Sequence, residues 1–246
     1  MHLPIPRARA WPLAGLLLLT SLTSQAAPDG DTLMQKGGAN PVALPCISCH
    51  APDGKGMAAA GFPRLAGLPA DYIRKQLHDF KAGRRQNGVM QPIATALTEE
   101  EIDALASAYA ARPRVNVAPQ PVGVPPEGSG AWIALRGAWD RSIPECTLCH
   151  GPGGVGVDPS FPPLAGQGAV YIENQLKAWR GTPAVKAHGK TKAVAAVPPS
   201  RQNDPNGLMQ HIAASLSPAE MKAVAEYFGS LGDSSEPFDD TQHRLR

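Results

Sequence analysis

The pentapeptide Cys-x-x-Cys-His occurs twice in this chain, at residues 46–50 and 146–150, and the two copies use all four cysteines. This spacing is typical of haem c attachment, in which both thiols form thioethers to the porphyrin. The histidine that follows can then supply one axial nitrogen to the iron. Because haem performs one-electron chemistry that side chains cannot perform, the repeated motif predicts a redox protein with two haems.

The four residues predicted to hold the haems covalently are Cys46, Cys49, Cys146 and Cys149. His50 and His150 are the predicted axial ligands on one face of each iron. Paired zinc half-sites usually lie roughly 15–20 residues apart, whereas 96 residues separate Cys49 from Cys146 here. A thioredoxin-like dithiol would need a βαβ context, which the sequence does not show. Disulfides remain an alternative in an exported protein, but they give no reason for either histidine.

The N-terminus has the pattern of a secretory signal. Arg7 and Arg9 precede an apolar stretch at 11–22, and Ser24-Gln25-Ala26 is a small-x-small cleavage site. We therefore predict a signal peptide at 1–26 and export to the periplasm, where haem c is attached. A retained signal acting as a membrane anchor is the alternative. No later stretch is long and apolar enough to span a membrane.

Charge and composition narrow the function further. The formal net charge is +2, and removal of the signal would take away two arginines and bring it near zero. Four haem propionates would then make the holoprotein mildly acidic. This balance argues against a nucleic-acid-binding protein. Aromatic residues make up only 5% of the chain, so a bound porphyrin would supply much of the apolar material of each core.

The sequence contains an internal repeat, in which the same motifs occur once in each half. Phe-Pro-x-Leu-Ala-Gly occurs at 62–67 and 161–166, Tyr-Ile-x-x-Gln-Leu at 72–77 and 171–176, and Met-Gln-x-Ile-Ala at 90–94 and 209–213. Such a long internal repeat predicts two similar units. The halves meet in a stretch rich in proline and glycine, which predicts domains at 27–117 and 131–246 joined by a linker at 118–130.

Each unit is predicted to be all-α, because helical periodicity is present and alternating strand patterns are absent. The expected helices cover 32–36, 69–82, 98–110, 132–136 and 217–229. Thr98 with Glu101, and Ser217 with Glu220, form capping boxes at the starts of the two C-terminal helices. Each half therefore reads as a small helical domain wrapped around its haem.

A methionine is the expected second axial ligand, since thioether sulfur is usual in electron-carrying cytochromes. Met57 lies too close to His50 in sequence to reach the opposite face of the ring. Met221 falls inside the final helix and is expected in the core. Met90 and Met209 remain, at equivalent places in loops that contain glycine, and we predict that they bind the two irons.

Each histidine ring also needs a hydrogen-bond acceptor that fixes its tautomer. The carbonyls of Pro52 and Pro152 follow the histidines by two residues and could accept from Nδ1. The alternative is that each proline merely turns the chain.

With these motifs in place, the chain resembles the di-haem class I cytochromes c of the cytochrome c4 family. The resemblance covers nearly all of the chain after the signal. It implies two tandem cytochrome c folds related by a pseudo-twofold axis, with haem propionates near the domain interface. It also implies a periplasmic carrier, often held at the membrane surface, that takes electrons from a dehydrogenase or quinol-oxidising complex and gives them to a terminal oxidase or reductase.

The second half departs from the repeat at 181–208, where extra residues precede its methionine. This segment contains Lys186, Lys190, Lys192 and Arg201 against only Asp204. The simpler interpretation is a solvated insertion. The sharper hypothesis is a basic docking lip beside the second haem for an acidic partner protein.

The predicted function is one-electron transfer by two six-coordinate haems, without catalytic residues. A di-haem peroxidase or thiol oxidoreductase would need an open iron position, and the methionine in each half argues against it. A third possibility is that the chain is the electron-accepting subunit of a separate periplasmic dehydrogenase.

Overall fold

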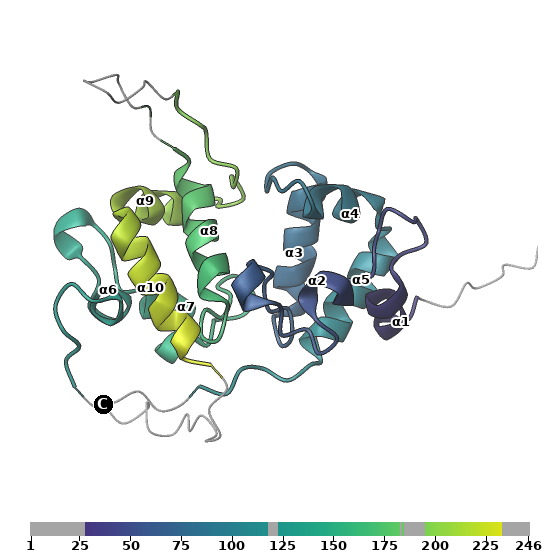
Figure 1. The fold of residues 1–246 in the computed structure, drawn as a ribbon, viewed down its shortest axis with the longest axis horizontal. Helices are drawn as coiled ribbons and strands as arrows, with labels where there is room; N and C mark the ends of the chain where they lie inside the picture. The colour runs from purple at the N-terminus through teal and green to yellow at the C-terminus, as the bar shows by residue number, and fades with distance from the viewer. Residues whose placement is uncertain (1–27, 118–122, 183, 185–194, 233–246) are drawn as a thin grey trace, which may run out of the picture.

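The computed structural model describes residues 28–117, 123–182, 184 and 195–232 (Figure 1). The predicted signal peptide lies outside these residues, as do part of the predicted linker and the lysines of the insertion. The described residues form helices and isolated bridges but no strand. Among them, no helix has the length and apolar character needed to cross a membrane.

Within the described residues, each half of the chain contains five α-helices. Those of the first half are α1 (Gly30–Lys36), α2 (Ile47–His50), α3 (Ala70–Lys81), α4 (Met90–Ala96) and α5 (Glu99–Ala110). Those of the second are α6 (Gly130–Arg136), α7 (Cys146–His150), α8 (Ala169–Arg180), α9 (Leu208–Ser215) and α10 (Pro218–Ser230). Short 3₁₀ turns are η1 (Ala58–Ala60), η2 (Trp139–Arg141) and η3 (Pro152–Gly154).

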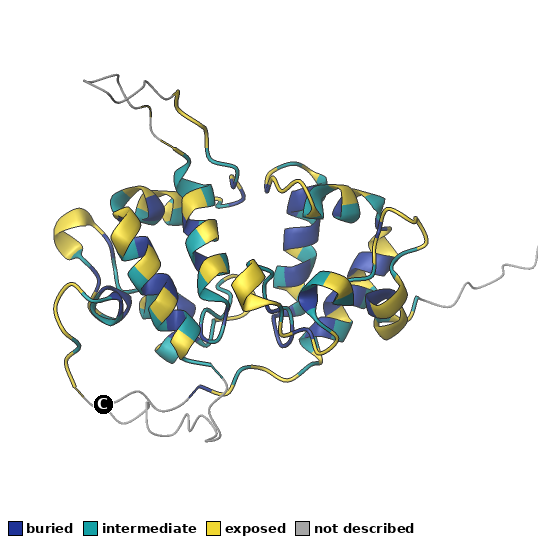
Figure 2. Cartoon of the chain, in the orientation of Figure 1, coloured by how far each residue is buried: buried dark blue, intermediate teal, exposed yellow. Residues whose placement is uncertain are grey.

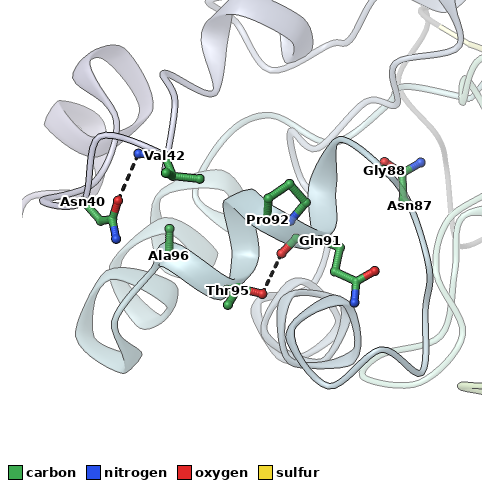
Figure 3. A pocket seen from close by; sticks show the side chains of 8 residues that line it. All are labelled: Asn40, Val42, Asn87, Gly88, Gln91, Pro92, Thr95 and Ala96. Atoms are coloured by element: carbon green, nitrogen blue, oxygen red, sulfur yellow. Dashed lines mark hydrogen bonds between the residues drawn. The ribbon is translucent and has the colours of Figure 1, made fainter.

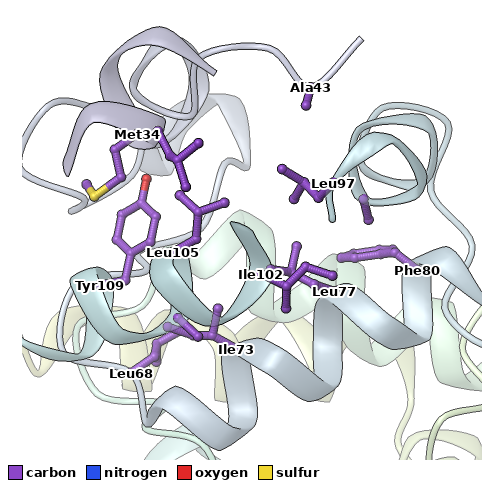
Figure 4. Close-up of a cluster of buried hydrophobic side chains, with 13 residues drawn as sticks. Met34, Ala43, Leu68, Ile73, Leu77, Phe80, Leu97, Ile102, Leu105 and Tyr109 are labelled. Atoms are coloured by element: carbon purple, nitrogen blue, oxygen red, sulfur yellow. The ribbon is translucent and has the colours of Figure 1, made fainter. Parts of the chain in front are cut away.

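The two halves pack their helices in the same way. In the first half α5 packs against α1 and α3, and α3 packs against α4; in the second, α10 packs against α6 and α8, and α8 packs against α9. Each half has its own cluster of buried apolar side chains, the first of which is shown in Figure 4. The buried faces of the helices point into these two clusters, and their other faces are exposed (Figure 2). The two copies of the sequence repeat therefore pack their helices in the same arrangement.

Helix caps explain where the N-terminal helix of each half begins. Asp29 accepts a hydrogen bond from the Thr32 backbone N at 3.0 Å, and Ser129 accepts one from Trp132 N at 3.1 Å. These caps start α1 and α6 two residues earlier than the sequence analysis predicted. Gly130, placed in the linker by that analysis, is the first residue of α6.

Close packing requires glycine at the start of both helices. A Cβ on Gly30 would lie 2.4 Å from the carbonyl oxygen of Ala104 in α5, and one on Gly130 would lie 2.0 Å from that of Ala223 in α10. The first and last helices of each half therefore cross with their backbones nearly in contact. Any larger residue would push them apart, because backbone atoms cannot move aside as a flexible side chain can.

The two halves also contact each other directly. The side chain of Gln167 accepts from the Arg64 backbone N at 2.8 Å and donates to the Arg64 carbonyl at 3.1 Å. The turn η1 of the first half packs against α8 of the second. A second contact joins the segments that lead into α4 and α9, where the backbones of Arg85 and Arg201 form an antiparallel bridge.

Candidate haem centres

The two Cys-x-x-Cys-His motifs form equivalent short helices, α2 and α7. All four cysteines are free thiols, so the disulfide alternative is not what the structure shows. Within the described residues, no group of three or more His, Cys, Asp or Glu side chains is arranged to hold a metal ion. Burial raises the pKa of the Cys46 thiol and raises that of Cys146 to about 12. Both thiols are therefore protonated at neutral pH when nothing is bound to them.

Both motif histidines are buried, with exposed fractions of 5% for His50 and 7% for His150. The Nδ1 atom of His50 lies 2.9 Å from the carbonyl oxygen of Pro63. That of His150 lies 2.8 Å from the carbonyl oxygen of Pro162. A carbonyl can only accept, so Nδ1 carries the proton and donates it.

This arrangement prepares each imidazole to bind iron. Burial lowers the pKa of both histidines, which favours the neutral ring. With the proton on Nδ1, the lone pair of Nε2 is free for a metal. The prediction that the acceptors belong to Pro52 and Pro152 was wrong. The acceptors come from the Phe-Pro repeat a dozen residues further on, because the chain folds back over the histidine after the motif.

The predicted methionine ligands lie on helices rather than in loops, which corrects the sequence analysis. Met90 is the first residue of α4, and Met209 is the second residue of α9. Asn87 starts α4 by accepting from the backbone N of Met90 at 2.9 Å. In the second half Asp204 accepts from Gln210 N at 2.9 Å. Both methionines therefore lie in first turns that a side chain hydrogen-bonds from before the helix.

Each half gathers one set of predicted ligands around one apolar cluster. Cys46 and Met90 pack, partly buried, against the first cluster, and Cys146 and Met209 against the second. Phe62 and Phe161 meet the rings of His50 and His150 edge-on. Two thiols, a thioether and an imidazole with a free Nε2 beside apolar side chains fit the donor set of a covalently bound haem.

A shallow hollow of about 610 Å³ lies beside the start of α4 (Figure 3). It is lined by Asn40, Val42, Asn87, Gly88, Gln91, Pro92, Thr95 and Ala96. None of the predicted ligands is among its lining residues, but Gly88 and Gln91 lie close to Met90 in the chain. Its lining carries no charged residue.

The family model for cytochrome c matches residues 29–107 and 143–232 of the chain. The chain belongs to the cytochrome c family. Both matched regions contain a methionine-bearing helix, and together they cover most of the two helical units described above.

Relatives of this cytochrome align along nearly its whole length. "Thiosulfate dehydrogenase electron acceptor" of Stutzerimonas stutzeri (strain A1501) is 53% identical over 224 residues, which cover 90% of this chain and 95% of the relative. "Cytochrome c4" of Thiocapsa roseopersicina is 37% identical, over 84% of this chain and 96% of the relative. The solved structure of thiosulfate dehydrogenase (TsdBA) from Marichromatium purpuratum superimposes with a TM-score of 0.65 and 35% identity. The match covers 88% of this chain but only 41% of that one.

These relationships establish the class of protein. The chain is a di-haem class I cytochrome c with two tandem all-α units and two covalently attached haem c groups. Its relatives are electron-transfer cytochromes, so its function is electron transfer.

One further repeat went unrecognised in the sequence. Arg-Gln-Asn occurs at 85–87 and again at 201–203, just before each methionine helix. The insertion hides this match, because it separates Arg201 from the end of α8. Arg201 was counted among the basic residues of the segment at 181–208, whether as a solvated insertion or as a docking lip. That placement was wrong for Arg201, which is only 4% exposed. Lys186, Lys190 and Lys192 lie outside the described residues.

Proposed function

We propose that this cytochrome accepts electrons from a thiosulfate dehydrogenase and passes them on one at a time. The observation that carries the proposal is the 53% identity, over 95% of its length, to a protein named as such an acceptor. A second relative of the same name, from Thiomonas intermedia (strain K12), is 42% identical over 81% of its length. In the Marichromatium purpuratum structure the matched region is part of a longer chain of a thiosulfate dehydrogenase, which favours close association of the two functions.

The proposed haem attachment follows from the site geometry. Thioether bonds would form at Cys46 and Cys49 in the first half and at Cys146 and Cys149 in the second. His50 with Met90, and His150 with Met209, would be the axial pairs. The support is the equivalent packing of Cys46 with Met90, and of Cys146 with Met209, against the two apolar clusters, together with the free Nε2 of each histidine.

A pair of haems suits a donor that releases electrons in pairs. Oxidative coupling of a pair of thiosulfate ions through a new S–S bond releases a pair of electrons, and each bound haem can store one. The carbonyls of Pro63 and Pro162 hold the imidazoles in one tautomer, so no proton need move at the iron ligand when an electron arrives. The apolar clusters keep water away from the ligand side chains, which favours the reduced state.

Export to the periplasm is part of the proposal. Its support is the signal-like pattern at 1–26 together with covalent haem attachment, which takes place outside the bacterial cytoplasm. N-terminal sequencing of the purified holoprotein tests it: a start near residue 27 is expected, and a start at Met1 would contradict cleavage.

Stopped-flow reduction tests the proposed electron donor. The oxidised holoprotein is mixed with a purified thiosulfate dehydrogenase and thiosulfate, and reduced-haem absorbance is followed. Both haems should be reduced at a rate that saturates with dehydrogenase concentration, and no reduction should occur when the enzyme is omitted. A holoprotein that ascorbate reduces fully but the complete enzyme mixture does not would disprove the proposal.

A free respiratory carrier is the second candidate, favoured by 37% identity over 96% of a cytochrome c4. In that case the cytochrome would be reduced by a quinol-oxidising complex and oxidised by a terminal oxidase. The same stopped-flow measurement with membranes and a quinol in place of the dehydrogenase distinguishes the two donors.

A further inference from the structure

The last helices of the two halves differ at one buried aromatic ring. Tyr109 on α5 and Phe228 on α10 occupy equivalent places after the Thr98 and Ser217 caps that start these helices. Both side chains lie in the core, with exposed fractions of 2% for Tyr109 and 0% for Phe228. The two rings therefore differ only in the hydroxyl group that Tyr109 carries.

The surroundings hold the two rings in the same way. In each half a glycine N–H donates to the backbone carbonyl of the ring residue, at 2.9 Å in the first half and 3.0 Å in the second. Each ring also lies against a glycine that follows the motif histidine. A Cβ on Gly54 would lie 3.1 Å from Cε1 of Tyr109, and one on Gly154 would lie 2.7 Å from Cε1 of Phe228. The hydroxyl of Tyr109 is thus an addition to a packing arrangement that does not require it.

The Tyr109 hydroxyl is a buried donor that is not used within the protein. It makes no hydrogen bond of ordinary geometry with any residue that the structure describes. Figure 4 shows it pointing away from α5, toward the part of the cluster where Met34 lies. The sulfur of Met34 already accepts from Arg112 at 3.6 Å. Because burying a hydroxyl without a partner costs free energy, this proton needs another acceptor.

The sulfur of Cys46 is the acceptor within reach. Cys46 packs against the same apolar cluster. Burial raises the pKa of Tyr109, and the neighbouring Cys46 raises it further. Burial also raises the pKa of Cys46, and Tyr109 partly offsets that rise. A thiol carries a proton of its own, whereas a thioether has only lone pairs, so haem attachment would turn this sulfur into a pure acceptor.

The second half has no equivalent donor. Phe228 has no hydroxyl, and Ala134 stands at the place that Met34 occupies in the first half. Tyr227 lies near Cys146, which raises its pKa together with burial, but Tyr227 is only partly buried. Among the described residues, a fully buried tyrosine beside a motif cysteine is therefore a feature of the first half.

We infer that the Tyr109 hydroxyl donates a hydrogen bond to the haem-bound sulfur of Cys46 and thereby raises the reduction potential of the first haem relative to the second. A donor at this sulfur withdraws electron density from the porphyrin. It stabilises the reduced state, because that state holds one more electron. The inference rests on the proposed attachment of the first haem at Cys46 and does not depend on which enzyme supplies the electrons.

The decisive variant is Tyr109→Phe in the holoprotein, because it keeps the buried ring and removes only the hydroxyl. Spectroelectrochemical titration gives both potentials, and haem-methyl NMR signals assign them to the two halves. The reduction equilibrium of the first haem should shift toward the oxidised form by roughly threefold to tenfold, the range expected for one hydrogen bond. The second haem should not change. The resonance Raman band of the thioether C–S stretch should also move in this variant.

Two further variants make the comparison specific. Tyr227→Phe is the matched control, because it removes a tyrosine hydroxyl near the other motif, and it should leave both potentials in place. Phe228→Tyr is the reciprocal change. It adds a hydroxyl on the side where Ala134 is smaller than Met34, and it should shift the second haem toward the reduced form.

The inference would be overturned if Tyr109→Phe left the first potential and the C–S band unchanged, or moved both haems equally. A role confined to packing predicts the first of these results, because phenylalanine fills the same space. Mass spectrometry of the haem-bearing peptide that contains Cys46 tests attachment separately. Attachment with an unchanged potential overturns only this inference, whereas a haem-free Cys46 would contradict the proposed haem site itself.

Discussion

The two halves of this cytochrome build the same candidate haem centre with different surroundings. The segments that hold the histidines and methionines match closely, down to the prolyl carbonyl that accepts from each Nδ1. The connection from α3 to α4 covers 82–89, whereas that from α8 to α9 covers 181–207. The second half tolerates the extra residues because Arg201 still forms its backbone bridge with Arg85 before α9 begins. The positions of the predicted ligands are therefore the same in both halves, whereas the length of the chain that connects them differs.

Equivalent residues can also carry different contacts. Glu101 and Glu220 complete the same capping box. Glu101 is buried and accepts in addition from the Ala39 backbone N at 2.6 Å. Glu220 instead accepts two hydrogen bonds from Arg141, at 2.7 and 3.0 Å. Each glutamate connects the last helix of its half to the segment before the haem motif. Glu101 does so through a backbone N–H, and Glu220 through its ion pair with Arg141.

The largest expected effect tests whether the two methionines are equivalent. Met90→Ala and Met209→Ala should each remove about half of the near-infrared methionine absorption and allow one haem to bind carbon monoxide. The affected potential should fall by on the order of 0.1 V or more, because thioether ligation raises it. Met57→Ala is the control and should change neither signal. If a methionine variant kept the full near-infrared methionine absorption of both haems, the replaced methionine would not be an iron ligand.

Core substitutions test whether the two clusters contribute equally to stability. Ile102 and Met221 occupy equivalent places in α5 and α10 and are 0% and 1% exposed. Replacing either with alanine should reduce the free energy of unfolding by about 2–5 kcal/mol, from lost burial and the cavity left behind. Thermal unfolding followed by Soret circular dichroism measures this. A loss in only one variant would show that the two cores are not equivalent.

The insertion offers the clearest difference in partner binding. If residues 181–208 form a docking lip, replacing Lys186, Lys190 and Lys192 together with glutamine should slow electron transfer with an acidic partner several-fold at low ionic strength. The difference should vanish at high salt, because screening removes the steering. Lys222→Gln is the control, because the Lys222 side chain on α10 is 65% exposed. Equal rates at low salt would favour a solvated insertion.

The smallest expected effect concerns Glu220. Its hydrogen bonds with Arg141 lower its pKa from 4.5 to about 2. A lowered native pKa contributes stability above the unfolded value, and this contribution is lost as pH falls from about 4.5 to 2. Glu220→Gln should therefore be less stable than wild type at neutral pH, and the gap in melting temperature should close in acid. Glu226→Gln is the control, because its lysine partner is 3.7 Å away and exposed. A gap that persists at pH 2 would contradict the proposed cause.

The sequence by itself determined the repeat, the haem motifs, the helical class and the two capping boxes. Each of these depends on local chemistry: motif spacing, helical periodicity, or a side chain that bonds its own backbone. It missed the starts of α1 and α6, because Asp29 and Ser129 cap without the glutamate that completes a capping box.

Only the tertiary structure decided which carbonyls fix the histidines and where Arg201 lies. Pro63 and Pro162 are remote in sequence from the residues they contact, and Arg201 pairs with a residue of the other half. Such contacts depend on how the chain folds back on itself, and no local pattern encodes that. The Cys-x-x-Cys-His motif indicates which atoms can bind a haem. Only the fold brings the buried guanidinium groups of Arg85 and Arg201 together.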